Sequence, residues 1–556
     1  MLPQVLPAPS LHDLFTERSK TPDHRAIAGG QALLLAKGVV MRRGFLLKGA
    51  VVAALVVLFD RMFPYDIAGA SIGGFAGAWL VGLLVGRRDV RRSGRAWFAL
   101  AAAALFAVAL VDDPGLLAWT LFWCALSIAA LLPKATGFDD AWHWGVRLAL
   151  HAVTGIAKPF GDLRRIWRRR QSARTGPRAV AGMLALPLAG GALFLLLFAA
   201  ANPLVEQALA AIRLPSVWRL LLWVAVALCL WPSLRPHAAA MRLAGRLPDP
   251  EPRLPGTSLL SVLIALALFN AIFAVQNGLD IAFLWSGGTL PAGMTQTEYV
   301  HRGAYPLIGT ALIAGVMALA MLRPGSESER HPLARRLVTV WVAQNLVLVA
   351  SSALRTIDYI EASMLTAWRI AALAWMVLVA LGLVLICWRI LAGRSARWLI
   401  NWNAAAAAIV LAVCAFADLG AIAAAWNVRA RAPERIDLCY LQRVGDGALD
   451  PLIDLEQRPM DAATRDRVRY VRARIFVDLA GRQDRWREWT PRGARRLAEA
   501  QRRLGVHPAQ PAPVARPAWR DCGGAVQTPP PPESRLDRVD GSDDPVSHAP
   551  HDPGRR

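Results

Sequence analysis

Positive charge alternates along this chain in step with its apolar stretches, and no other feature restricts the possible fold as strongly. Eleven stretches are apolar and close to the roughly 20 residues that a membrane-crossing helix needs. Every second connection between them is basic: six connections hold 32 Lys and Arg residues, whereas the short connections between them hold four. Basic connections stay in the cytoplasm. The pattern therefore predicts a multi-pass protein of the bacterial inner (cytoplasmic) membrane, with a cytoplasmic N-terminus and a periplasmic C-terminus.

The connections and spans are defined as follows. The basic connections are the N-terminal arm and Arg87–Arg95, Lys134–Arg178, Arg235–Arg253, Arg323–Arg336 and Arg389–Arg397. The opposite short connections contain Arg61, Arg213, Arg302 and Arg355. The expected spans are 45–63, 66–86, 96–111, 115–133, 179–202, 217–232, 257–277, 304–322, 337–354, 368–388 and 399–425.

Composition agrees with this interpretation. Hydrophobic residues make up 55% of the 556 residues and the mean hydropathy is +0.36, outside the range of ordinary soluble domains. The net charge of +23 is explained by cytoplasmic loops facing anionic lipid, so we expect no nucleic-acid partner. The predicted fold is all-α: a polytopic transmembrane bundle of about 11 spans with a small α-helical C-terminal soluble tail.

These patterns divide the chain into six regions. They are a cytoplasmic N-terminal arm (1–44), the first four transmembrane helices (45–133), a basic amphipathic cytoplasmic segment (134–178), a seven-helix transmembrane core (179–426), a periplasmic helical tail (427–510) and a disordered end rich in Pro, Asp and Arg (511–556).

The basic segment 134–178 is too long for a simple turn. Its apolar residues, from Trp144 to Trp167, recur at near-helical spacing between lysines and arginines. Such a helix favours a position flat on the membrane surface, where anionic headgroups attract its basic residues. We therefore expect the lipid bilayer to be its partner.

Charged residues of both signs gather in two neighbouring connections that the topology places outside. Such residues could line a small polar site, or they could form an ion-paired cap that holds helices together. They are Asp280, Glu298, His301 and Arg302 in the first connection and Arg355, Asp358 and Arg369 in the second.

Asp418 is the one acid expected well inside a span and away from its ends, on the order of 12 Å from its outer end at 1.5 Å per residue. A carboxylate in that position should face the bundle and find a partner, for which Arg219 and Arg369 are candidates. It completes the candidate polar site.

Metal and cofactor motifs are not evident. Glu298 and His301 have Glu-x-x-His spacing, but a di-iron site of that kind needs two copies and further glutamates. Walker, nucleophile-elbow and dinucleotide motifs are also missing from the sequence. We expect no metal and no cofactor.

Several runs carry a resemblance to a known family. They are Phe269–Asp280, Leu284–Gly288, Leu290–Met294, Glu298–Leu307, Trp341–Asn345, Ser351–Arg355, Leu365–Arg369, Trp398–Asn403 and Asn427–Arg429. In them the chain resembles, over about 175–445, a bacterial multi-pass membrane family catalogued as a domain of unknown function, family four-one-seven-three (4173). The resemblance implies membrane topology and no particular activity.

Three functions remain open on these observations. The favoured one is a non-catalytic envelope scaffold or sensor component, with an unidentified envelope protein as a possible partner. The alternatives are a small-solute transporter or channel, and a membrane enzyme with a polar site facing the periplasm; the sequence favours a protein that is not an enzyme.

Two cysteines, Cys439 and Cys522, lie outside the apolar runs and after the last span. In a periplasmic tail they would meet an oxidising environment, in which paired thiols form disulfides. We therefore expect a disulfide between them, with Cα atoms within about 7 Å.

Overall fold

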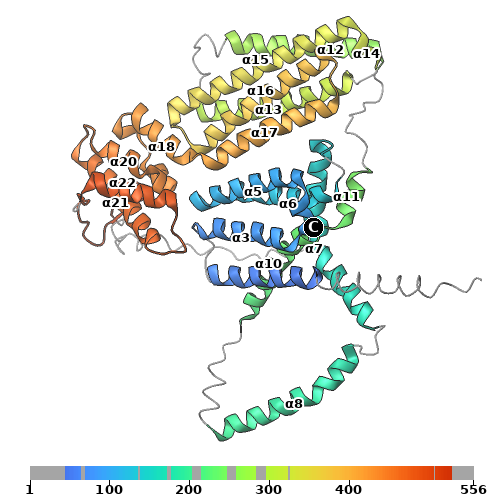
Figure 1. Ribbon diagram of the computed structural model, residues 1–556. Helices are drawn as coiled ribbons and strands as arrows, with labels where there is room; N and C mark the ends of the chain where they lie inside the picture. The colour runs from blue at the N-terminus through green and yellow to red at the C-terminus, as the bar shows by residue number, and fades with distance from the viewer. Residues whose placement is uncertain are drawn as a thin grey trace, which may run out of the picture. The chain divides into compact units, whose positions relative to one another are not determined.

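The structure is a computed structural model that describes most of the chain (Figure 1). The chain consists of two compact units. Unit 1 comprises Met1–Leu419 and Arg482–Ala494, and unit 2 comprises Gly420–Gly481 and Arg495–Arg556. The described residues are 44–63, 69–135, 138–171, 177–202, 215–246, 258–282, 296–322, 326–505 and 508–528, with the side chains of 166–181, 238–240 and 296–308 left out.

The first helix group of unit 1 has a core of aromatic and leucine side chains, among them Phe75, Trp79 and Phe122. Close approach of α3 and α5 depends on Gly73, because a Cβ there would lie 2.4 Å from the backbone nitrogen of Val111. The group contains a helix at 44–62, α3 (Ser71–Gly86), α4 (Arg88–Arg92), α5 (Gly94–Asp112), α6 (Leu116–Leu131), η1 (Leu132–Lys134), α7 (Ala141–Gln171), α10 (Val217–Leu234) and α11 (Ala238–Ala244).

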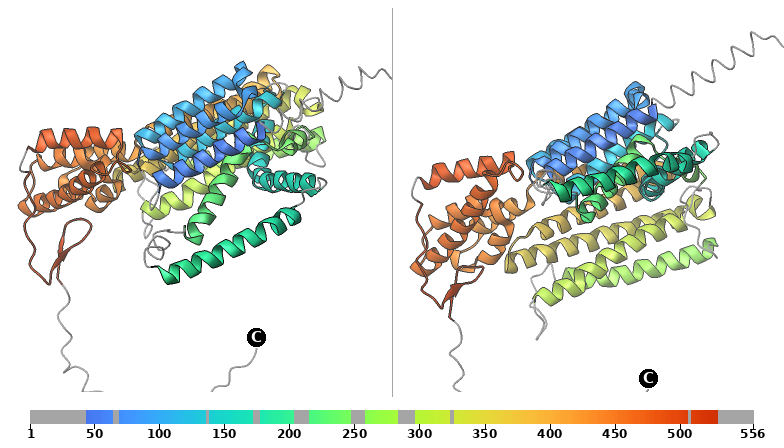
Figure 2. Two further views of the ribbon diagram at one scale, coloured as in Figure 1. Left: turned by 60° about the horizontal axis from the view of Figure 1, so that its bottom comes forward. Right: turned by 90° about the horizontal axis from the view of Figure 1, so that it is seen from below.

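The second helix group of unit 1 packs around Leu266, Trp341 and Leu383. Its long helices lie side by side, with α15 against α12, α13 and α16 (Figures 1 and 2). The helices are α12 (Leu259–Asp280), α13 (Gln296–Met321), α14 (Glu327–Arg330), α15 (Pro332–Ser363), α16 (Ala367–Ala392) and α17 (Ala396–Phe416).

Eight helices in the described part of the chain are long and apolar enough to cross a membrane. They correspond to eight of the expected spans and are Gly94–Asp112, Leu116–Lys134, Gly182–Ala201, Val217–Leu234, Leu259–Asp280, Pro332–Ser363, Ala367–Ala392 and Ala396–Phe416. The expected second and eighth spans have shorter apolar helices, Ser71–Gly86 and Gly309–Met321. α8 (Pro177–Ala201), which contains the third of the eight, buries none of its apolar window against protein. The chain is thus a multi-pass, helical membrane protein, and the total of eleven spans stays a prediction.

The last expected span is not one continuous helix. We expected it over 399–425, but α17 ends at Phe416 and α18 (Leu419–Ala430) begins after a break at Ala417 and Asp418. Asp418 therefore lies between two helices and not within a transmembrane helix, which corrects its expected depth.

Unit 2 is a small helical domain with a buried core that includes Leu441, Leu452 and Val471. Its elements are α18, η3 (Pro433–Arg435), α19 (Leu438–Val444), η4 (Gly445–Ala448), α20 (Leu449–Glu456), most of α21 (Ala462–Gln483) and of α22 (Pro491–Leu504), and the antiparallel strands β1 (Trp519–Arg520) and β2 (Val526–Gln527).

The start of the disordered end was predicted too early. We placed it at 511, but β1 and β2 form a hairpin within that range. Arg520 and the backbone of Ala512 both bind Asp466 of α21 at 2.6 Å. Cys439 and Cys522 form a disulfide with their Cα atoms 4.9 Å apart, inside the expected limit. Together these contacts hold residues that composition alone marked as unstructured.

Candidate functional site

The candidate polar residues are distributed over several places in unit 1. Asp280, at the end of α12, is 4% exposed and forms a 2.5 Å ion pair with Arg355 of α15. Gln276, one turn earlier on α12, donates a second hydrogen bond to the same carboxylate oxygen at 3.0 Å. A buried carboxylate needs such partners because its transfer from water is costly. This pair joins α12 to α15.

Amide side chains extend this contact along the same two helices. Gln344 donates to the side-chain oxygen of Asn270 at 2.9 Å, and Asn270 donates to the backbone of Leu337. Asn277 donates to the backbone oxygen of Gln344 at 3.1 Å. We call Asn270, Asn277, Asp280, Gln344 and Arg355 the polar seam.

Some acceptors of this region have no donor among the residues that the structure describes. They are Asn277 Oδ1, Asp280 Oδ2, Gln344 Oε1 and Asn345 Oδ1, all buried. Three of these oxygens belong to the polar seam, and Asn345 follows Gln344 on α15. Buried polar atoms are normally hydrogen-bonded, so the three oxygens make the polar seam a site suited to water or a small polar ligand.

The remaining residues of the second outer connection do not join this pair. The guanidinium of Arg369 lies 4.0 Å from the ring centre of Tyr359 and donates to the backbone oxygen of Met364. Asp358 is exposed at the end of α15. Glu298, His301 and Arg302 belong to α13, but their side chains lie outside the described residues. Among the described residues, no group of His, Cys, Asp and Glu could hold a metal ion.

Asp418 has a partner that the sequence did not suggest. Arg492, from the segment Arg482–Ala494 of unit 1, bonds Asp112 at 2.8 Å and Asp113 at 2.7 Å and lies 3.8 Å from Asp418. It also donates to the backbone oxygen of Phe416 at 3.0 Å. Arg492 thus joins the end of α5 to the break after α17, and we call these contacts the arginine hub.

The two partners proposed for Asp418 are occupied elsewhere. Arg219 of α10 pairs with Asp60 at 2.5 Å, which also accepts from Trp223. Arg369 lies against Tyr359, as described above. The expectation that Asp418 has a basic partner is met by Arg492, which lies 3.8 Å from its carboxylate.

Backbone contacts fix the 482–494 segment next to the arginine hub. The amide of Ala70 donates to the oxygen of Trp489 at 2.8 Å, and the hydroxyl of Ser71 donates to that of Arg487 at 3.2 Å. Gly69 has a φ of +68°, and a Cβ on it would lie 2.2 Å from the Arg487 oxygen. Only glycine fits there without displacing the segment.

Elsewhere in the first helix group, side chains from five places in the chain meet around a pocket of about 340 Å³. It is lined by Lys48, Arg87, Asp89, Lys134, Lys158, Leu234, Arg235 and Pro236. Arg87 is the most buried of the cations, with 1% of its side chain exposed. It donates to the backbone oxygens of Ala130 and Ser233 and pairs with Asp89. We call this the basic pocket.

Helix α7 contributes its polar face to this region. Asp162 is buried and binds Lys158 at 3.0 Å, Trp231 at 3.1 Å and Arg235 at 3.5 Å. His151, about three turns before Asp162 on the same face of α7, is 2% exposed. Its burial, with the positive charges of Arg87 and Lys134, lowers its pKa to about 4. The imidazole is therefore neutral at pH 7.

The opposite face of α7 is apolar and exposed. Val153, Ile156, Phe160 and Leu163 are between 59% and 71% exposed. A helix that buries charged residues and exposes apolar ones fits a lipid environment on its outer side. This is consistent with the surface position expected for the basic segment.

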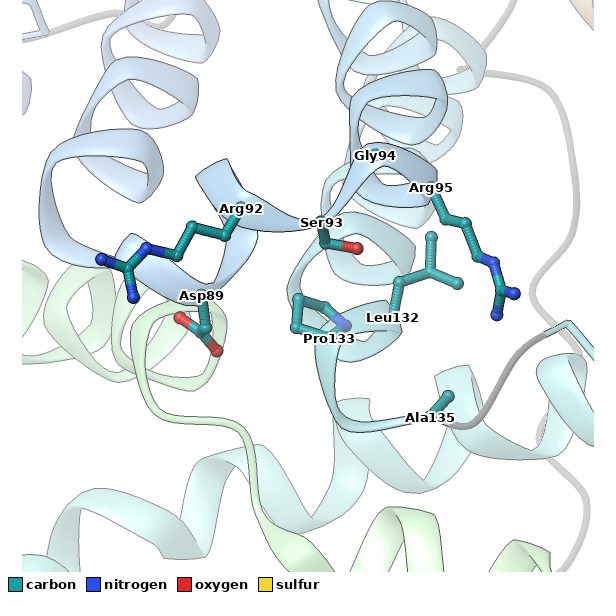
Figure 3. A pocket seen from close by; sticks show the side chains of 8 residues that line it. All are labelled: Asp89, Arg92, Ser93, Gly94, Arg95, Leu132, Pro133 and Ala135. Carbon is teal, nitrogen blue, oxygen red and sulfur yellow. The ribbon is translucent and has the colours of Figure 1, made fainter.

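A second pocket, of about 540 Å³, shares Asp89 with the basic pocket. Figure 3 shows Arg92 and Arg95 flanking it, with Leu132 and Pro133 between them. The sequence interpretation missed both pockets, because it assigned their cations to topology alone. Lys48 within an apolar run and Asp162 within a basic segment were the available signals.

Comparison with known families places the chain. A model described as "Domain of unknown function (DUF4153)" matches residues 99–455, more than half of the sequence. The chain belongs to the DUF4153 family. The resemblance to a domain of unknown function is thus supported, but the number of the matching family is 4153, not 4173. The DUF4153 match also begins well before 175, so that it includes most of α5 and all of α6 and α7. The comparisons with curated proteins and with solved structures found no match.

Proposed function

We propose that this DUF4153 protein is a non-catalytic scaffold or sensor component of the bacterial inner membrane. In this proposal the N-terminus is cytoplasmic, the disulfide-bonded tail is periplasmic and carries the surface for an envelope partner, and α7 lies on the anionic cytoplasmic leaflet. Support comes from the alternation of basic connections and from the exposed apolar face of α7.

One observation carries the choice of a scaffold: three charged residues of the candidate site, Asp280, Arg355 and Asp418, form ion pairs between helices. Asp280 binds Arg355 across α12 and α15, and Asp418 shares Arg492 with Asp112. General acid–base catalysis instead needs titratable groups within reach of one reacting centre. Ion pairs at separate helix contacts fit a structural role for these residues.

Exchanging the two charges of an interhelical ion pair tests this structural role. Asp280→Arg and Arg355→Asp should each lower the thermal stability of the purified protein in detergent, because each leaves two like charges together. The double variant should recover most of the loss, since the pair is rebuilt in reverse. A matched exchange at Arg485 and Glu488, an ion pair whose arginine is 63% exposed, should change little.

If the double variant is as unstable as the two single variants, the two residues do not act as a simple ion pair between helices. Their native positions would then be required by the other contacts of the polar seam.

Three acceptors of the polar seam have no donor among the described residues, and they favour a second candidate, a small-solute transporter or channel. Carbonyl and carboxylate oxygens are suited to small cations as well as to water. Purified protein in liposomes that contain a pH- or Na⁺-sensitive dye measures this directly. Flux that exceeds that of empty liposomes and is lost in Asn277→Leu would favour the transporter, and its absence with both ions would favour the scaffold.

A further inference from the structure

The basic pocket brings together cations from the first described helix and from three of the basic connections. Lys48 comes from the helix at 44–62, Arg87 precedes α4, Lys134 ends η1, Lys158 lies on α7 and Arg235 follows α10. Topology alone requires these charges on one side of the membrane, but it does not require them at one pocket. Their convergence needs a separate explanation.

The carboxylates near the pocket are too few to neutralise it. Asp89 pairs with Arg87, and Asp162 serves both Lys158 and Arg235. Lys134 donates to the backbone oxygen of Pro236 at 3.0 Å, a neutral acceptor. Lys48 has no hydrogen bond or ion pair with any described residue, although it lines the cavity. Five cations thus face two carboxylates.

We propose that the basic pocket binds a phosphate group. Arg87 is held by two carbonyl oxygens and by Asp89, so it places a fixed positive charge in the pocket wall before any ligand enters. The ammonium groups of Lys48 and Lys134 keep N–H groups available for an anion. Guanidinium and ammonium groups are the usual protein partners of phosphate oxygens. The cavity of about 340 Å³ lies within the size range of small-ligand pockets, and excess positive charge makes an anion its natural occupant.

The surroundings point to the headgroup of an anionic phospholipid as one source of this phosphate. Lys158 enters the pocket from the same helix that exposes Ile156 and Phe160. A lipid could therefore place its phosphate among the cations and its acyl chains along α7. The uncompensated charge would also disfavour the choline group of a zwitterionic lipid. Inorganic phosphate offers the same chemistry without the chains.

The test uses the full-length protein in a neutral detergent with three soluble probes: short-chain phosphatidylglycerol, phosphatidylcholine with the same chains, and inorganic phosphate. The rise in unfolding temperature with probe concentration gives an apparent Kd for each. Lys48→Gln should weaken binding of phosphatidylglycerol about tenfold, the effect of losing one charge-assisted hydrogen bond. Lys48→Arg should bind nearly as the parent protein does.

Arg91→Gln is the matched control, since Arg91 is an exposed cation of α4 that lines neither described pocket. It removes one positive charge from the same region and should leave the Kd unchanged. If Lys48→Gln does not fold, the parent protein still decides: its preference for phosphatidylglycerol over phosphatidylcholine should decrease as salt screens the pocket.

The outcomes separate the sources of phosphate. Stabilisation by phosphatidylglycerol alone, dependent on Lys48, supports a lipid headgroup, and equal dependence for inorganic phosphate supports a soluble phosphate. Equal binding of both lipids, or an equal effect of Lys48→Gln and Arg91→Gln, would overturn the proposal. The scaffold role rests on other residues and would survive that result.

Discussion

Replacement of Arg492 by Met should release the 482–494 segment from the ends of the neighbouring helices. The guanidinium contacts Asp112 and Asp113 below 3 Å and Asp418 at 3.8 Å, so its loss leaves three carboxylates close together without this cation. Met keeps much of the length and apolar volume of the side chain. The change therefore tests charge more than packing.

The expected magnitude follows from burial. Breaking a fully buried ion pair costs about 3–5 kcal/mol, and an exposed pair contributes about 0.2–1 kcal/mol. Arg492 is 14% exposed, while its carboxylate partners range from 25% to 52%. An intermediate value of about 2 kcal/mol corresponds to roughly a 30-fold change in the opening equilibrium.

Hydrogen exchange at the Ala70 amide measures this opening, because that amide donates to the Trp489 oxygen. Its exchange rate should rise by about 30-fold in Arg492→Met. Arg485→Met breaks an ion pair in the same segment between a well-exposed arginine and the partly buried Glu488, and it should raise the exchange rate less than about fivefold. Equal rates in the two variants would refute the reasoning that the arginine hub holds the segment.

Two further predictions concern the tail and α7. Reduction of the Cys439–Cys522 disulfide, or Cys439→Ser, should lower the free energy of unfolding of unit 2 by about 4 kcal/mol, because the bond closes a loop of 83 residues. Denaturant titrations with and without reductant measure this change. Coincident unfolding curves would contradict the prediction. The pKa of His151 is about 4 in the folded protein and about 6.5 in the unfolded chain, so protons bind preferentially to the unfolded state. The folded protein therefore keeps its full stability above pH 6.5 and loses stability as the pH falls towards 4. The parent protein should lose about 2 kcal/mol relative to His151→Phe between pH 7 and pH 5, measured by denaturant unfolding, and parallel pH profiles would contradict the assignment.

Much of the helical architecture could be predicted from the sequence, because a bilayer requires long apolar helices. The eight long apolar helices lie where hydropathy placed spans. The break at Asp418 was missed because the apolar pattern continues beyond it. Asp418, a preferred residue type immediately before a helix, and Gly420 were the local signals of a new helix start. At this helix break, Asp418 contacts Arg492, which lies 74 residues later in the chain. Intrinsic helix propensities carry no information about such a distant contact.

The sequence allowed residues of the candidate site to be selected, but not the contacts that they form with one another. Asp280 and Arg355 were both selected for their charge, yet only packing of α12 against α15 brings them together. The basic pocket was missed for a related reason. The charge count places Arg87, Lys134 and Arg235 on one side of the membrane, but their meeting point depends on how α3, α6, α7 and α10 pack.

The topology is the claim on which the scaffold proposal depends, and paired reporter fusions test it directly. Fusions to alkaline phosphatase, which is active in the periplasm, and to a fluorescent protein that folds in the cytoplasm are made after Arg178 and after Arg435. The account predicts a cytoplasmic signal at Arg178 and a periplasmic signal at Arg435. The same compartment at both positions would contradict the predicted number of spans and the periplasmic location of the tail.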